Sequence, residues 1–117
     1  MATGDIVGFP DDDCIYYPDT LNNILSFFLD PEFKCYDAVL GQIYDNNNHQ
    51  PLIKNWPQKK SKVTKFNFYK LSSSTTLFCK KNNRSFNESM GVGAKFGSCE
   101  DAEYIYQMLV SRGKIFY

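Results

Sequence analysis

The spacing of apolar residues predicts an amphipathic helix in the first third of the chain. Four apolar residues fall at i, i+3, i+4 and i+7 and so share one helical face: Leu21, Ile24, Leu25 and Phe28. Asp19 or Thr20 caps this helix. Asp30-Pro31 ends it, because the residue before a proline disfavours helical backbone.

A second helix is predicted near the end of the chain. Ser98 is its cap, Asp101 follows three residues later in a pattern close to a capping box, and Gly113 can end it in the left-handed conformation. Its apolar face is formed by Ala102, Ile105, Tyr106, Leu109 and Val110.

Alternating or apolar segments predict strands before and between the two helices. These segments are residues 5–9, 36–44, 63–70, 75–80 and 90–96. Helices separated by a run of strands predict an α+β fold, in which an antiparallel sheet carries two helices packed on one face. The other face of the sheet would then be available to a partner.

The length of the chain fits one domain, residues 1–117. Residues 45–62 contain an asparagine run, two prolines and a lysine cluster, which predicts a long, exposed, basic loop. Trp56, the single tryptophan, lies in this loop. It either contacts a partner or packs down to anchor the loop, and the sequence leaves both interpretations open.

Charge is strongly segregated although the net charge is zero. Residues 1–45 hold nine acidic residues and one basic residue, residues 46–87 hold nine basic residues and no acidic one, and residues 88–117 hold four and three. In one interpretation the basic segment packs beside the acidic third and neutralises it. In the other it forms a surface that binds a polyanion.

Catalytic and metal-binding patterns are weak. His49, the single histidine, lies in the asparagine-rich segment without a nucleophile or ligand close in sequence. The acidic turn Asp11-Asp12-Asp13 could bind a cation, but adjacent carboxylates without spaced partners make a poor calcium loop, so we interpret it as a solvated turn. Gly91 to Lys95 lacks the Gly-Lys-Ser/Thr ending of a phosphate loop. These features favour a binding protein over an enzyme, without a metal or cofactor.

The cysteines and the N-terminus indicate an intracellular protein. The four cysteines are too widely spaced for a zinc knuckle or a redox dithiol, so we expect small, reduced core residues: Cys14, Cys35, Cys79 and Cys99. No secretory signal and no apolar run long enough to span a membrane is visible. We therefore expect a nuclear or cytoplasmic protein that is not secreted and does not bind a membrane.

Parts of the chain resemble one half of a TATA-binding protein domain, over about residues 21–44 and 75–112. The resemblance is carried by Thr75-Thr76-Leu77-Phe78, by Met90-Gly91-Val92-Gly93-Ala94-Lys95, and by Glu100-Asp101-Ala102 opening a helix; upstream, residues 21–28 and 30–40 are similar to the first helix and the approach to the next strand. The resemblance implies that a concave sheet face binds the DNA minor groove, with Phe78 as a wedge between bases and Tyr36 at the other aromatic position.

Four features depart from the pattern of that family. Only one half is present, so a saddle would require a homodimer. Residues 45–62 are an insertion, and the connection from Lys80 to Ser89 is longer than the family's turn. The net charge of zero is also unusual for a DNA clamp.

The leading hypothesis from the sequence is a DNA-binding regulatory protein, a viral or otherwise divergent TATA-binding-like factor. Basic residues would neutralise phosphates and aromatic residues would stack on bases. The predicted contact residues are Lys54, Trp56, Lys59, Lys60, Lys62, Lys65, Lys70, Phe78, Lys80, Lys81 and Arg84. The alternative is a protein–protein interaction or structural module without catalytic activity, which self-associates or binds a partner protein.

Overall fold

A five-stranded sheet organises the part of the chain that the computed structural model describes, residues 3–91, 93–95 and 97–117. Its strands, in spatial order, are β1 (Ile6–Gly8), β6 (Leu77–Lys80), β2 (Ala38–Leu40), β7 (Ile115–Phe116) and β5 (Lys62–Val63). β2 and β7 run parallel, and the other neighbours are antiparallel. The sheet is therefore mixed, which corrects the prediction of a purely antiparallel sheet.

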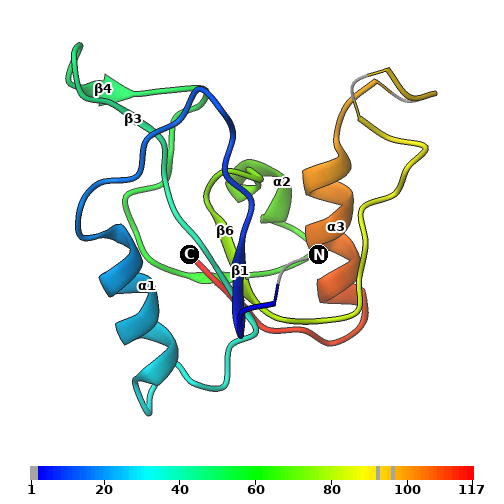
Figure 1. The fold of residues 1–117 in the computed structure, drawn as a ribbon, viewed down its shortest axis with the longest axis horizontal. Coiled ribbons are helices and arrows are strands. Elements are labelled where there is room, and N and C mark those ends of the chain that lie inside the picture. Colours follow the sequence, from blue (N-terminus) through cyan, green and yellow to red (C-terminus); the bar gives the residue numbers. More distant parts are fainter. Residues whose placement is uncertain (1–2, 92, 96) are drawn as a thin grey trace.

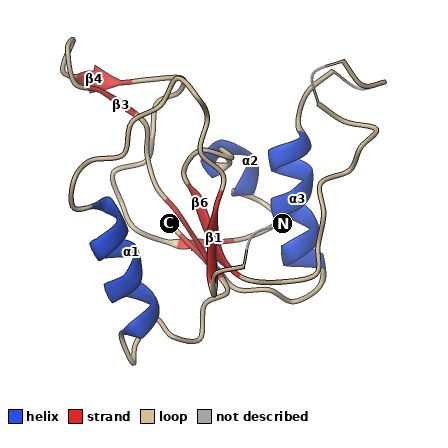
Figure 2. Ribbon diagram, in the orientation of Figure 1, coloured by secondary structure: helices blue, strands red, loops and turns tan. Residues whose placement is uncertain are grey.

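A short hairpin and three helices complete the fold (Figures 1 and 2). The hairpin pairs β3 (Tyr44–Asp45) with β4 (Gln50–Pro51). The helices are α1 (Thr20–Leu29), α2 (Phe68–Leu71) and α3 (Glu100–Val110). Asp45 shapes the hairpin turn, because its carboxylate accepts hydrogen bonds from the backbone N–H of Asn47 and Asn48 at 2.9 and 3.2 Å.

The two long helices cover opposite faces of the sheet, with α1 on one side and α3 on the other (Figure 1). On the α1 side, Val39 and Phe78 pack with Phe28 in one buried cluster. The prediction that both helices share one face is therefore wrong. All three residues of β2 are buried, and a strand buried on both faces needs a covering layer on each.

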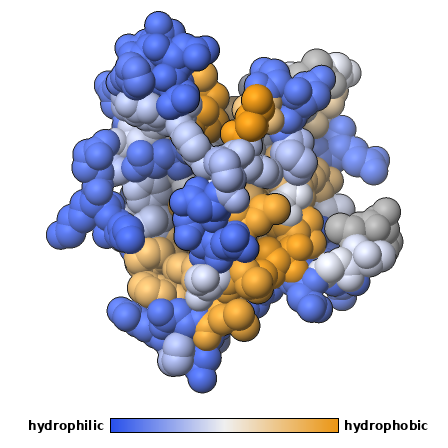
Figure 3. All heavy atoms as spheres, turned by 60° about the vertical axis from the view of Figure 1, so that its left-hand side comes forward, coloured by the Kyte–Doolittle hydropathy of each residue, from blue (hydrophilic) through white to orange (hydrophobic). Residues whose placement is uncertain are grey.

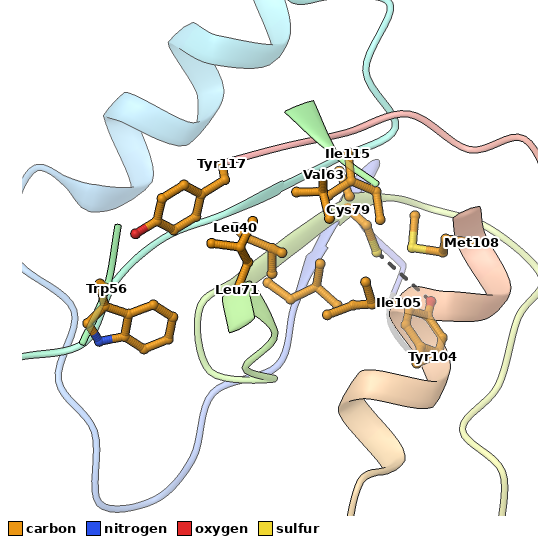
Figure 4. Close-up of a cluster of buried hydrophobic side chains, with 12 residues drawn as sticks. Leu40, Trp56, Val63, Leu71, Cys79, Tyr104, Ile105, Met108, Ile115 and Tyr117 are labelled. Atoms are coloured by element: carbon orange, nitrogen blue, oxygen red, sulfur yellow. Dashed lines mark hydrogen bonds between the residues drawn. The ribbon is translucent and has the colours of Figure 1, made fainter. Parts of the chain in front are cut away.

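The larger core lies between the sheet and α3 (Figure 4). Ile105 and Met108 of α3 and Leu71 of α2 meet side chains of alternate strand residues, including Leu77 and Cys79 of β6. This alternation follows from the period of two along a strand, which sends Phe78 to the α1 side and its neighbours to the α3 side.

The sequence pattern located some elements correctly and others wrongly. The first strand, the first helix, the strand before Lys80 and the last helix are confirmed. The strand predicted for 63–70 is wrong after Val63, because the side chain of Asn67 accepts a hydrogen bond from the Thr64 backbone N–H at 2.7 Å and turns the chain into α2. The strand predicted for 90–96 is absent from its described residues, and positions 92 and 96 lie outside them.

The end of α3 differs from the prediction in one residue. Arg112, not Gly113, has the left-handed conformation, with φ 65°. The Arg112 N–H donates to Leu109 O at 3.2 Å, and the Gly113 N–H donates to Met108 O at 2.8 Å. These two bonds form a Schellman motif, in which Arg112 occupies the position where glycine is most common.

Candidate active site

An acidic turn follows the end of β1. Pro10 lies between β1, which ends at Gly8, and the turn. The Cys14 backbone N–H donates a hydrogen bond to Asp11 O at 3.4 Å, which closes the turn. Ligand atoms of Asp11, Asp13 and Cys14 all lie within 4.8 Å of one another. The turn therefore presents two carboxylates and a thiol to the same small volume.

The long-range anchor of this turn is Thr75. β1 and β6 pair antiparallel with Gly8 opposite Phe78, and continuing that register by three residues brings Asp11 opposite Thr75. The Thr75 hydroxyl donates to Asp11 Oδ2 at 2.6 Å, and the Tyr16 hydroxyl donates to Thr75 O at 3.1 Å. These bonds hold one of the two carboxylates in a fixed orientation.

The donor set fits a hard divalent cation. Mg²⁺ and Mn²⁺ prefer carboxylate oxygens, and Asp11 and Asp13 supply these. Burial, together with the hydrogen bond to Asp13 at 3.5 Å, raises the pKa of the Cys14 thiol above its ordinary value. In the absence of a metal the thiol therefore stays protonated near neutral pH, and the carboxylates of Asp11 and Asp13 are the charged ligands of the turn.

More carboxylates lie at the same end of the sheet, where α3 begins. Figure 1 shows that α3 starts at the end toward which β1 runs. Glu100, Asp101 and Glu103 fall in the first turn of this helix. Asp101 Oδ1 accepts a hydrogen bond from the Ala102 N–H at 2.7 Å. Glu103 Oε2 is buried without a hydrogen-bond partner among the described residues.

The predicted nucleic-acid contacts are dispersed or buried. Trp56 is only 4% exposed and donates its Nε1–H to Leu52 O at 2.9 Å, so it anchors the loop. Phe78 is 6% exposed beneath α1, and a wedge between bases would have to be exposed. Lys54 donates its ammonium group to Ser72 O at 2.7 Å and lies over the Trp56 ring.

The remaining predicted basic residues fall into two groups. Five are exposed on the loop and around β5 and α2: Lys59, Lys60, Lys62, Lys65 and Lys70. The other three, Lys80, Lys81 and Arg84, line one pocket together with Arg112. The prediction missed Arg112, because it lies 28 residues after Arg84 in a segment of mixed charge.

The cysteines only partly match their predicted role as core residues. All four are unpaired, but Cys35 and Cys99 are exposed and Cys14 is half-buried. Cys79 is buried, and its sulfur lies 4.0 Å from the Tyr104 hydroxyl (Figure 4). None of the helices in the described part of the chain has the length and apolar character needed to cross a membrane.

A scan against protein-family models matches residues 1–97 to the family described as Glycosyl transferase family 2. The matched segment contains the acidic turn, β1, α1, β2 and β6. Searches of curated proteins and of solved structures find no match.

This match overturns the functional interpretation drawn from the sequence. The resemblance to a TATA-binding protein half is wrong, and with it the assignment as a DNA-binding regulator of viral character. The alternative of a non-catalytic interaction module and the expectation that the protein is not an enzyme are also contradicted. The residues of the supposed resemblance are short, common combinations, whereas the family match spans most of the chain. The chain belongs to glycosyl transferase family 2.

Proposed function

We propose that this protein takes part in the transfer of a glycosyl group from a phosphate-activated sugar to a hydroxyl acceptor. The observation that carries the proposal is the family match over residues 1–97, which includes the turn that presents Asp11 and Asp13.

The chemistry of glycosyl transfer explains why such a turn is useful. The acceptor oxygen forms a bond to the anomeric carbon while the bond from that carbon to the phosphate oxygen breaks. The phosphate leaves with the electron pair, and a base takes the proton of the acceptor hydroxyl. A bound divalent cation stabilises the negative charge that develops on the leaving phosphate.

Cation binding and proton abstraction would be carried out by carboxylates at one end of the sheet, in the acidic turn and at the start of α3. Asp11 and Asp13 would hold the cation, and the hydrogen bond from Thr75 would orient Asp11. A base is the second requirement. The carboxylates of Glu100 and Asp101, which begin α3 at the same end of the sheet, are the candidates.

The cation site can be tested without knowing the sugar donor. Mn²⁺ should broaden the amide NMR signals of residues 11–14 and 75 selectively. Asp11→Asn or Asp13→Asn should weaken Mn²⁺ binding by at least ~10–100-fold, the loss that follows removal of even an outer-shell partner. Asp12→Asn is the matched control, because Asp12 is outside the ligand cluster.

Turnover is the second measurement. With Mg²⁺ or Mn²⁺ and a panel of nucleoside diphosphate sugars, we expect release of the nucleoside diphosphate with at least one donor. Asp11→Asn should reduce this release strongly. Thr75→Val should reduce it less, because the carboxylate remains but loses its orientation. The absence of both selective Mn²⁺ broadening and donor turnover would refute the proposal.

A further inference from the structure

A cationic pocket lies at the opposite end of β6 from the acidic turn. It has a volume of about 270 Å³, and four of its lining side chains are cationic: Lys80, Lys81, Arg84 and Arg112. They come from the end of β6, from the turn that follows it and from the end of α3. Among the described residues Asp37 is the one acidic member of the lining, so four positive charges minus one negative charge leave a net charge of +3.

The four cations outnumber the single carboxylate that the described lining contains. None of them forms an ion pair in the described part of the chain, although Lys80 donates its ammonium group to Lys34 O at 2.6 Å. Asp37 Oδ2 is occupied as the acceptor of a hydrogen bond from the Lys114 backbone N–H at 2.7 Å. Four positive charges that share one lining with a single carboxylate repel one another, and a bound anion would relieve that repulsion.

The backbone at Arg112 gives independent support. Its left-handed conformation, with φ 65°, is unfavourable for a residue with a Cβ and is most often occupied by glycine at this position of a helix end. Such strain is concentrated at functional sites. Here the residue that bears the strain adds a guanidinium group to the pocket.

An apolar pocket adjoins the cationic one. It has a volume of about 410 Å³, and its lining includes Ile6, Leu25, Phe28 and Leu29 together with Asp5. Lys80 and Lys81 line both pockets, so these two lysines lie between the apolar pocket on the α1 side and the cationic pocket at the end of α3. The Lys80 ammonium nitrogen lies 5.8 Å from the centroid of the Phe28 ring.

The outer side of this apolar region is open. Leu25 is 50% exposed and Leu29 is 71% exposed. Figure 3, which turns the α1 side toward the viewer, shows apolar residues gathered in the lower half of that face. A ligand can therefore reach the apolar pocket from outside.

We propose that the two pockets together bind an organic phosphate, with its phosphate group in the cationic pocket and its apolar part in the pocket beneath α1. A phosphate dianion matches the excess of positive charge, and Arg84 and Arg112 offer planar groups suited to paired hydrogen bonds with phosphate oxygens. The proposal does not depend on glycosyl transfer, since it uses residues at the other end of β6 from the acidic turn.

Calorimetric titration tests the proposal with three probes: inorganic phosphate, hexyl phosphate and hexanol. The titrations are made in the absence of divalent cations and sugar donors, so that their failure leaves the glycosyl transfer proposal untouched. We expect inorganic phosphate to bind and hexyl phosphate to bind at least ~10-fold more tightly, because burial of two methylene groups contributes about that factor. Hexanol should bind at least ~10-fold more weakly than hexyl phosphate, since it lacks the charged group.

Variants separate the two halves of the site. Arg84→Gln and Arg112→Gly should each lower the affinity for both phosphate probes by about 5–30-fold, because each removes one charged hydrogen-bonding partner. Arg112→Gly is compatible with the backbone, so a loss of binding there is not a loss of folding. Leu25→Ser should lower the affinity for hexyl phosphate toward that for inorganic phosphate and leave the affinity for inorganic phosphate unchanged. Asp37→Asn should strengthen phosphate binding, because it removes the opposing charge and keeps an oxygen acceptor for Lys114.

The loop residues provide the matched control. Lys59→Gln removes one exposed positive charge outside the pocket and should leave binding of both phosphate probes unchanged. No binding of either phosphate probe would overturn the proposal. Equal affinities for inorganic and hexyl phosphate would overturn the part of the proposal that places the apolar group in the pocket beneath α1. Equal losses of affinity in Lys59→Gln and Arg84→Gln would mean that phosphate is attracted by the overall positive charge and not bound at this pocket.

Discussion

The geometry at the end of α3 predicts that substitutions at two adjacent residues, Arg112 and Gly113, change the free energy of unfolding in opposite directions. Replacing Arg112 with glycine removes the steric cost of a left-handed residue with a Cβ, about 1–2 kcal/mol. Glycine in turn loses about 0.5–1 kcal/mol more conformational entropy on folding. Arg112→Gly should therefore raise the free energy of unfolding by about 0.5–1 kcal/mol.

Replacing Gly113 with alanine should have the opposite effect. A Cβ at this position would lie 2.7 Å from the Met108 carbonyl oxygen, which is closer than such contacts allow. The same oxygen accepts the Gly113 N–H bond that closes the Schellman motif. The backbone must shift and weaken that bond, at a cost of about 1–3 kcal/mol, as for an overpacked site. Gly97→Ala is the control, because its Cβ would meet nothing within 4 Å.

Urea unfolding followed by tryptophan fluorescence measures these changes. Trp56 is the single tryptophan and is 4% exposed, so its emission should report the loss of the core. The midpoint should rise for Arg112→Gly, fall for Gly113→Ala and stay near its original value for Gly97→Ala. A fall for Arg112→Gly would refute the reasoning, since it would mean that the arginine side chain stabilises the helix end more than its backbone strain destabilises it.

The other predictions concern the second core cluster, the thiols and the hairpin turn. Phe78→Ala should lower the free energy of unfolding by about 3–5 kcal/mol, whereas Phe66→Ala, at a residue that is 99% exposed, should change it little; urea midpoints measure both. Iodoacetamide at pH 8, followed by mass mapping, should modify exposed Cys35 quickly and Cys79 only on unfolding, because Cys79 is buried and desolvation raises the pKa of its thiol. Hydrogen bonds from Asn48 hold the pKa of Asp45 below its ordinary 3.8, so NMR should find a lower titration midpoint, and the stabilisation it gives above pH 3.8 should be lost as pH falls through the folded value.

The periodicity of apolar residues was sufficient to locate the elements that are long and amphipathic. The spacing of Leu21 to Phe28 located α1 to within one residue at each end, and the apolar face from Ala102 to Val110 located α3. The same periodicity could not decide which residues of α1 face the sheet. Leu21 and Leu25 belonged to the predicted stripe but are 62% and 50% exposed, and Phe27, outside that stripe, packs against the core.

The sheet topology depended on information that the sequence pattern does not carry. β7 and β5 each have two residues, too few for a periodic signal. Their pairing is decided by contacts between residues 62–63 and 115–116. The sequence therefore predicted the presence of a sheet but not its mixed order or its two covered faces.

The candidate site was visible only in part. The sequence alone predicts a solvated turn at Asp11 to Asp13, because adjacent carboxylates by themselves do not indicate a metal site. What separates this turn from other acidic turns is Thr75, which is 64 residues away and is joined to Asp11 only through the pairing of β1 with β6. A polar residue placed opposite the acidic run in that register was the signal that could have been used.

The position of β7 has a consequence for the order in which the chain can fold. Among the described strands, β5 joins the sheet through β7 alone, and β7 lies between β5 and β2. During synthesis on the ribosome, residues 62–63 therefore emerge long before the partner that they pair with. Until residues 115–116 emerge, the edge of β2 that pairs with β7 in the folded chain has no strand partner. At this stage of synthesis a chaperone or a neighbouring nascent chain has access to that edge.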